Sequence, residues 1–306
     1  MGTIPNGWLA FELGVLRRLK FKSVSLAFAG EPDLGVYLKR WGVRVAANDL
    51  AQWAATKAAA SIENNTEQLS DEDIAVVLED AYVPRHKLSN GALRKWFNET
   101  DAWWFDNVRQ GIEKLDTHAR RALALTCGMA VGDYALSFDE GTREFRQPLS
   151  QVFRRVWQSL PTPVDNSQSN TSDNREARDF IAEQHTNLLY LRLPRAKGAH
   201  EQGRDTFSSW REEWLRGEDG FWGEFEKARA GRLGTSVVTK GQYLRFVEDL
   251  LRVALHLPAW AIAYTEDGFV QTSDLVEAVN RVRKVETVYS KDFSDLTGLR
   301  AAIITA

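Results

Sequence analysis

The sequence predicts an α/β fold in which a largely parallel β-sheet is interrupted by a helical insert. Strand-like apolar runs alternate with helical stretches at both ends of the chain, over 23–63 and 187–305. Between about 71 and 160, apolar residues recur at three- and four-residue spacing without a strand-like run. The first strand, turn, helix and second strand, which ends in an acid, follow the order that begins a Rossmann-like sheet.

The elements can be assigned in chain order. The first expected strand is SVSLAF at 23–28, followed by the turn AGEPD and a helix over 34–41. The second strand, VRVAA at 43–47, ends at Asn48 and Asp49, and an alanine-rich helix follows over 51–63. Later strands are expected at 187–191, 259–264, 285–290 and 300–305, with helices at 240–255 and 272–282.

These elements divide the chain into three parts. Residues 71–160 form the helical insert and include DEDIAVVLEDAY and THARRALALTCGMAVGDYAL. Residues 161–175, PTPVDNSQSNTSDNR, are almost free of apolar side chains and are expected to form a flexible connector. Residues 1–70 and 176–306 then make up the α/β domain.

Composition narrows the function classes. The chain of 306 residues has a net charge of −3, so any DNA binding must depend on local basic patches. No apolar run approaches the ~20 residues needed to cross a bilayer, and the first residues lack a signal-peptide core, so we expect a cytoplasmic protein. The single cysteine, Cys127, lies in an apolar stretch and is expected to be a small buried side chain.

Several catalytic motifs are missing from the sequence. No two of the five histidines are three or four residues apart, so we expect no zinc pair and no metal site. There is neither a GxSxG nucleophile elbow nor a GxxxxGK[ST] phosphate loop. Metalloproteases, elbow-type hydrolases and P-loop NTPases are therefore disfavoured.

The turn after the first strand has features of a nucleotide-like binding site. Gly30 and Asp49 are 19 residues apart, close to the ~20 of dinucleotide-binding fingerprints. A glycine allows a ligand to approach the backbone, and an acid at the end of the second strand accepts hydrogen bonds from ribose. The same pattern also occurs as ordinary α/β architecture without a ligand.

The wider segment FAGEPDLGVYLKRWGVRVAANDL resembles the first motif of the DNA adenine methylase family, the Dam-like N6-adenine methyltransferases. The resemblance implies a Rossmann-like S-adenosylmethionine-dependent methyltransferase sheet. It also implies that Phe28 and Gly30 line the S-adenosylmethionine site and that Asp49 holds the ribose. The family's second glycine is Pro32 here, preceded by Glu31. Proline offers no N–H and adds bulk where the ligand should come close, so binding and loss of the cofactor both stay open.

Residues 95–114, KWFNETDAWWFDNVRQGIEK, resemble the family's stretch where contacts to DNA begin. The resemblance therefore implies that the insert, 71–160, is the DNA-recognition region. The preceding segment contains basic residues without an acid, an arrangement that suits either phosphate binding or a solvated surface. The expected DNA contacts there are Arg85, Lys87, Arg94 and Lys95. The aromatic cluster is expected to be core rather than a base-stacking surface, and comprises Trp96, Phe97, Trp103, Trp104 and Phe105.

The family's catalytic loop, an apolar residue followed by Y-x-D-P-P-Y, has been rewritten. In the family the target adenine is flipped out, the Asp and a backbone carbonyl accept hydrogens from N6, and the last aromatic stacks on the base. Here the strand reads NLLYLRLPRAKGAH. The four motif positions from Asp to the aromatic are occupied by Arg192, Leu193, Pro194 and Arg195. Arginine has only donors and cannot accept hydrogens from an amine.

The resemblance spans about residues 10–305, with the motifs in family order. AWAIAYTEDGFVQTSDLVEAVNR resembles the family's late strand and following helix, with Ala263 at the usual serine, and RAAIIT resembles the closing strand. We therefore expect a pseudo-methyltransferase that acts as a DNA-binding or partner subunit, beside an active methyltransferase or within a restriction-modification or phage-defence system. Arg192, Arg195 and Lys197 would then contact phosphates or stack on a base.

Two alternatives remain. One is an active, site-specific adenine methyltransferase with a divergent catalytic loop, which would use S-adenosylmethionine. The other is a protein–protein scaffold that binds neither DNA nor cofactor.

Overall fold

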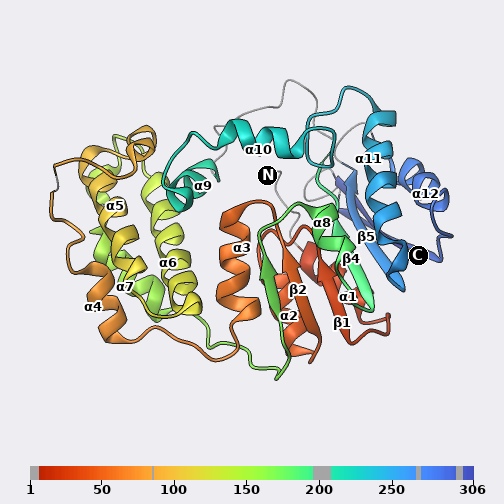
Figure 1. Ribbon diagram of the computed structural model, residues 1–306, viewed down its shortest axis with the longest axis horizontal. Helices are drawn as coiled ribbons and strands as arrows, with labels where there is room; N and C mark the ends of the chain where they lie inside the picture. The colour runs from red at the N-terminus through yellow and green to blue at the C-terminus, as the bar shows by residue number, and fades with distance from the viewer. Residues whose placement is uncertain (1–6, 85, 196–207, 267–269, 294–298) are drawn as a thin grey trace.

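A seven-stranded sheet lies at the centre of the computed structural model, which describes residues 7–84, 86–195, 208–266, 270–293 and 299–306 (Figure 1). The strand order is β3-β2-β1-β4-β5-β7-β6. The strands are β1 (Ser23–Leu26), β2 (Arg44–Asn48), β3 (Thr171–Asp173), β4 (Leu188–Arg192), β5 (Ala259–Glu266), β6 (Thr287–Phe293) and β7 (Leu299–Thr305). Strands β1 to β5 pair in parallel, whereas β7 runs antiparallel to both β5 and β6. The predicted α/β class with a largely parallel sheet is confirmed.

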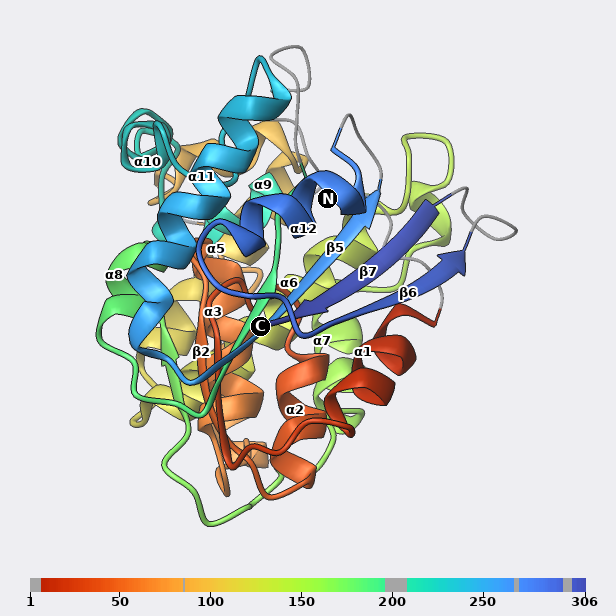
Figure 2. The same ribbon diagram turned by 90° about the vertical axis from the view of Figure 1, so that its right-hand side faces the viewer.

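Helices cover both faces of this sheet, which explains why its central strands are continuously apolar. On one face lie α1 (Trp8–Leu16) and α2 (Asp33–Arg40). On the other lie α8 (Ala177–Ala182), α11 (Lys240–Val253) and α12 (Thr272–Asn280) (Figure 2). Within the described part of the chain, no helix combines the length and apolar character that crossing a bilayer requires.

The expected insert is helical, and its apolar residues belong to a cluster separate from those on the two faces of the sheet. Its helices are α4 (Asp71–Leu78), α5 (Glu99–Glu113), α6 (His118–Leu136) and α7 (Leu149–Gln158), with short 3-10 turns at Gly91–Lys95 and Arg143–Phe145. Phe97, Trp104 and Phe105 are buried in this core, and so is Cys127, as predicted. Trp96 and Trp103 pack against it half-buried.

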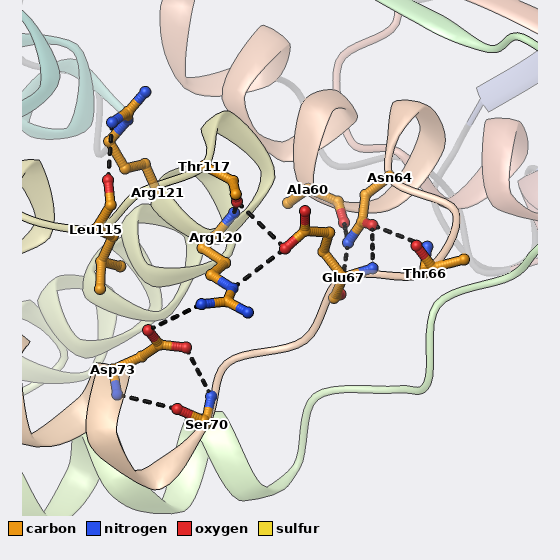
Figure 3. A network of polar contacts seen from close by, with 10 residues as sticks. All are labelled: Ala60, Asn64, Thr66, Glu67, Ser70, Asp73, Leu115, Thr117, Arg120 and Arg121. Carbon is orange, nitrogen blue, oxygen red and sulfur yellow. Dashed lines mark hydrogen bonds and ion pairs between the residues drawn. The ribbon is translucent and has the colours of Figure 1, made fainter.

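Helix α3 (Gln52–Ala58) continues as a π-helical segment, Ala59–Glu63, between the sheet and the insert. Figure 3 shows the polar contacts that fix the chain beyond it. The Asn64 side chain donates to the Glu67 carbonyl at 2.9 Å and accepts from the Glu67 N–H at 2.8 Å. The Glu67 carboxylate in turn accepts from Thr117 and Arg120 of the insert, at 3.2 and 3.1 Å. These contacts tie the insert to the end of the helix that leaves the sheet.

The polar segment expected to be a connector contains the edge strand β3. The Asn170 side-chain oxygen accepts from the Val45 N–H at 2.9 Å, and Asn166 donates to the Val43 carbonyl at 2.8 Å. Asparagine side chains therefore take over hydrogen bonds of the sheet edge beside the short β3. Because β3 is brief and polar, it carries no apolar pattern by which the sequence would reveal it.

Helices α9 (Ser209–Arg216) and α10 (Trp222–Arg229) depart from the expected domain division. They cross from the insert toward the sheet above α3 (Figure 1). Trp210 and Trp214 of α9 are fully buried in the core of the insert, although they follow β4 in the chain. Their rings lie against Gly132 and Gly128 of α6, where any larger residue would overlap them. A segment from the second half of the chain thus completes the insert.

Replacing Gly132 by alanine tests this packing. A Cβ at Gly132 would overlap the Trp210 ring, so we expect Gly132→Ala to lower the free energy of unfolding by about 1–3 kcal/mol through overpacking. Gly14→Ala is the matched control, because Gly14 is also helical but has open space around it; it should gain up to about 1 kcal/mol in helix propensity. Urea denaturation of both variants measures the difference, and equal stabilisation by both would contradict the proposed packing.

Candidate functional site

The sequence-predicted site residues of the α/β domain meet at the carboxyl edge of the parallel strands. Phe28 and Gly30 follow β1, Asp49 follows β2, and Arg192 ends β4. β1 pairs with β2 on one side and with β4 on the other. The chain therefore reverses its winding direction here, which is where ligands bind in open α/β sheets. Helices α9 and α10 lie over this edge (Figure 1).

Asp49 joins the turn after β1 to the start of α3. One carboxylate oxygen accepts from the Gly30 N–H at 2.9 Å, and the other accepts from the Ala51 N–H at 2.9 Å. Gly30 has a φ of +56°, a left-handed conformation that glycine adopts without a steric cost. Burial raises the pKa of Asp49 from its ordinary value of 3.8 to about 6, although both backbone hydrogen bonds and Arg229 oppose the shift.

Glu31, which occupies the middle position of the glycine motif, is neutralised by two cations. Its carboxylate pairs with Lys57 of α3 at 2.8 Å and with Arg211 of α9 at 3.5 Å. Arg211 also forms a two-pronged ion pair with Asp133 of α6. Both cations lie over the ring of Trp53. This network connects the turn after β1, the insert and α9.

Glu212 of α9 occupies the amino-terminal end of α3. Its two carboxylate oxygens accept from the N–H groups of Gln52 and Trp53, at 2.9 and 3.2 Å. The helix dipole stabilises a negative charge at such a position, and free N–H groups there are ready-made anion sites. Glu212 is buried and is balanced by Arg216 at 2.8 Å. The anion site at the start of α3 is therefore filled by the protein itself.

Arg192 is committed to an ion pair on the α1 side of the sheet. Its Nε and Nη2 donate to the two oxygens of Glu12 at 2.6 and 2.7 Å, and the Tyr190 hydroxyl donates to Glu12 at 2.7 Å. Glu12 is completely buried, whereas the Arg192 side chain is 19% exposed. Burial is the largest single influence and lowers the pKa of Arg192, but the charge and hydrogen bonds of Glu12 and Tyr190 together outweigh it and raise the pKa above its ordinary value. Arg192 is thus the cation that balances the buried charge of Glu12.

The residues after Arg192 are fixed by the core. The Leu193 N–H donates to the Ala263 carbonyl at 3.0 Å, which extends the pairing of β4 with β5, and its side chain is buried. The Pro194 carbonyl accepts from the Tyr243 hydroxyl of α11 at 2.7 Å. Arg195 is half-buried; burial raises the pKa of Tyr264, and Arg195 is near enough to oppose that rise. The loop 192–195 therefore contains no side chain that accepts a hydrogen bond, and the Pro194 carbonyl is already bonded to Tyr243.

Phe28 lines a small pocket between β1, α8 and α11. Its other lining residues include Arg178, Leu233 and Phe246. The cavity volume is about 10 Å³, which is room for roughly one water molecule. Nucleoside-sized ligands need pockets of ~300 Å³ or more, so this pocket cannot hold one without rearrangement.

The predicted DNA contacts of the insert are on its surface. Lys87, Arg94 and Lys95 are exposed, and Lys95 pairs with Asp219 in the turn between α9 and α10. Arg85 and Lys197 lie outside the described residues. The carboxyl edge therefore gathers Phe28, Gly30, Asp49 and the residues 192–195, whereas Arg94 and Lys95 lie on the 3-10 turn of the insert that packs against α9.

In sequence comparisons the chain matches no protein-family model and no curated protein.

Three residues that sequence reasoning missed organise the edge: Glu12, Arg211 and Glu212. Arg211 and Glu212 lie between Trp210 and Trp214, whose four-residue spacing matches that of Gly128 and Gly132 in α6. That matched spacing was the available signal for α9. Glu12 carried a weaker signal, since it is a single acid within the apolar stretch WLAFELGVL.

The titration of Asp49 is a direct test of its burial. Because its folded-state pKa of about 6 exceeds the ordinary 3.8, the folded protein holds this proton more tightly than the unfolded chain. The stability that Asp49 contributes is therefore complete below about pH 4 and is lost as pH rises to about 6. Carboxyl ¹³C NMR of wild type and Asp49→Asn should assign a midpoint near 6 to Asp49. A midpoint near 4 would contradict the prediction.

Because Arg192 and Glu12 form an ion pair, we expect the effects of replacing them on the free energy of unfolding to be non-additive. Arg192→Met leaves the Glu12 carboxylate buried without its cation and should lower the free energy of unfolding by about 3–5 kcal/mol. The double variant Arg192→Met/Glu12→Leu should lose less than the single variant, because no charge is left buried. Urea denaturation of both measures the coupling. A loss below about 1 kcal/mol for Arg192→Met would argue against a structural ion pair.

Proposed function

We propose that this chain is a methyltransferase-like protein that does not transfer methyl groups and acts as a DNA-binding or partner subunit. The observation that carries the proposal is the ion pair of Arg192 with buried Glu12. Arg192 occupies the position where the family resemblance requires a hydrogen-accepting aspartate. On this proposal the chain keeps the methyltransferase-like fold and lacks the acceptor that methyl transfer needs.

The sheet topology supports the methyltransferase-like part of the proposal. The order β3-β2-β1-β4-β5-β7-β6, with β7 antiparallel between β5 and β6, is the arrangement implied by a Rossmann-like methyltransferase sheet. A helical insert between β2 and β3 also agrees with the family outline. Because one fold hosts many activities, topology supports kinship and not catalysis.

The family makes the adenine amine a better nucleophile with two acceptors, the Asp side chain and a backbone carbonyl. The Arg192 guanidinium, at the Asp position, has only donors. The Pro194 carbonyl of the same loop already accepts from Tyr243. A substrate amine bound at this edge would therefore meet no side-chain acceptor at Arg192.

The residues at the carboxyl edge do not fit S-adenosylmethionine. Each Asp49 oxygen that would receive ribose hydroxyls already accepts one hydrogen bond, from Gly30 or Ala51, which leaves only part of its capacity. Glu31, which the methionine carboxylate would approach, is itself a carboxylate that already holds Lys57 and Arg211 in ion pairs, so it offers that group no attraction. By contrast, the open space beside Gly30 suits a ligand.

Methyl transfer from labelled S-adenosylmethionine tests the proposal directly. Wild-type protein is incubated with unmethylated genomic and plasmid DNA of varied sequence, beside an active adenine methyltransferase as a positive control. We expect incorporation at the level of the protein-free blank, because no acceptor is available at Arg192. Calorimetry with S-adenosylmethionine should give no binding heat at ligand concentrations up to ~1 mM. A Kd of that size corresponds to a binding free energy of about −4 kcal/mol.

The control variant is Asp49→Ala. Incorporation by wild type that disappears in Asp49→Ala would sink the proposal and favour an active enzyme with a divergent loop. Methyl incorporation that persists unchanged in Asp49→Ala would indicate a contaminating enzyme. The assay would then be repeated with repurified wild-type protein.

A further inference from the structure

A band of cations lies at the amino edge of the sheet, opposite α9 and α10. It comes from two turns, one between α1 and β1 and one between α2 and β2. The turns adjoin, because the Arg44 N–H donates to the Lys22 carbonyl at 3.0 Å. We call the set the amino-edge band, and its members are Arg17, Arg18, Lys20, Lys22, Arg40 and Arg44. All are exposed except Arg44, which is half-buried.

Three of these arginines are stacked on aromatic rings. Arg17 lies 5.2 Å from the ring centre of Trp41, and Arg40 lies 5.2 Å from that of Tyr37. Arg18 lies 5.4 Å from the ring centre of Tyr289 in β6. A guanidinium stacked on a ring keeps its N–H edge available and has less freedom to lose when it binds an oxyanion. The rings therefore preorganise the band for phosphate.

The band has little negative charge near it. Residues 13–48 contain only two acids, Glu31 and Asp33, and both belong to the opposite edge of the sheet. From another element, Asp165 faces this region and acts on buried Lys39. None of the six cations forms an ion pair with another residue that the structure describes. This concentration is unusual in a chain with a net charge of −3.

We propose that the amino-edge band binds the phosphodiester backbone of a nucleic acid without reading its sequence. Cations spread along two adjoining turns suit a repeating anion, whereas a single small anion is held by groups that converge in a pocket. Phosphate contacts position a nucleic acid but carry no base information. The proposal does not rest on the proposed function, because it concerns the edge of the sheet opposite Asp49 and Arg192.

A nucleic acid fits this surface better than an anionic membrane does. Membrane-surface binding normally combines basic residues with exposed apolar side chains that enter the lipid. The exposed large apolar residues near this edge come from three separate elements: Tyr37 of α2 at 39%, Val288 of β6 at 40% and Leu255 before β5 at 50%. The rings of Trp41 and Tyr289 are half-buried beneath arginines. The chemistry here is therefore that of phosphate neutralisation rather than of apolar insertion.

Fluorescence anisotropy with a labelled 30-base-pair duplex and a labelled 30-nucleotide single strand, at 50–200 mM NaCl, tests the proposal. The test variant is Arg17→Ala/Lys22→Ala. It should weaken binding about tenfold and reduce the slope of log K against log salt by about 2, roughly one for each cation removed. Arg154→Ala/Arg155→Ala on α7 is the charge-matched control, because both residues are exposed and distant in the chain. It should change binding less than twofold.

The outcomes are distinct. Equal weakening by both double variants would assign binding to the overall charge and overturn the proposal. Loss of binding in Lys87→Ala/Arg94→Ala, with wild-type binding in Arg17→Ala/Lys22→Ala, would overturn it in favour of the insert. Failure of wild type to bind either probe at 50 mM NaCl, or tighter binding to phosphatidylserine vesicles, would also overturn it. Circular dichroism and thermal melting confirm that each variant is folded.

Discussion

The docking of α9 onto α6 is the contact on which the arrangement of the carboxyl edge depends. Gly128 and Gly132 allow the rings of Trp214 and Trp210 to lie against the α6 backbone. This anchors the intervening residues, so that Arg211 reaches Glu31 and Asp133 while Glu212 reaches the start of α3. Apolar packing supplies the stabilisation, and the charged residues use the position it gives them. The insert, α9 and the sheet are thereby joined at one place.

A common principle explains the charges at this edge: each one is satisfied within the protein. Arg192 is paired with Glu12, Glu31 with Lys57, and Glu212 with N–H groups of α3. Sites that bind charged ligands usually leave such groups available or hold them with water. Here a ligand would have to break interactions whose members are partly or wholly buried. The amino-edge band shows the opposite arrangement, since its cations have no ion-pair partners among the described residues.

The sequence predicted the features that depend on local pattern. The central strands are apolar runs and were identified correctly. Gly30 and Asp49 belong to one strand–helix–strand unit, so their spacing in the sequence was enough to place them side by side. Strand β3 was missed because three polar residues at a sheet edge have no periodicity. The pair of Glu12 with Arg192 joins residues 180 positions apart, and no local pattern indicates which acid meets which base. The DNA contacts expected at Arg85 and Lys197 fall outside the described residues.

The contribution of Trp210 and Trp214 to the core of the insert also affects how the protein folds during synthesis. The helices α4 to α7 leave the ribosome well before α9. Their apolar core stays incomplete until Trp210 and Trp214, about 50 to 60 positions beyond α7, have been synthesised. Until then the groove at Gly128 and Gly132 exposes apolar surface that other chains or chaperones can bind. Non-local contacts of this kind slow folding, because the loop must close before the contact contributes stability. The insert is therefore a late-maturing unit and not an independent domain.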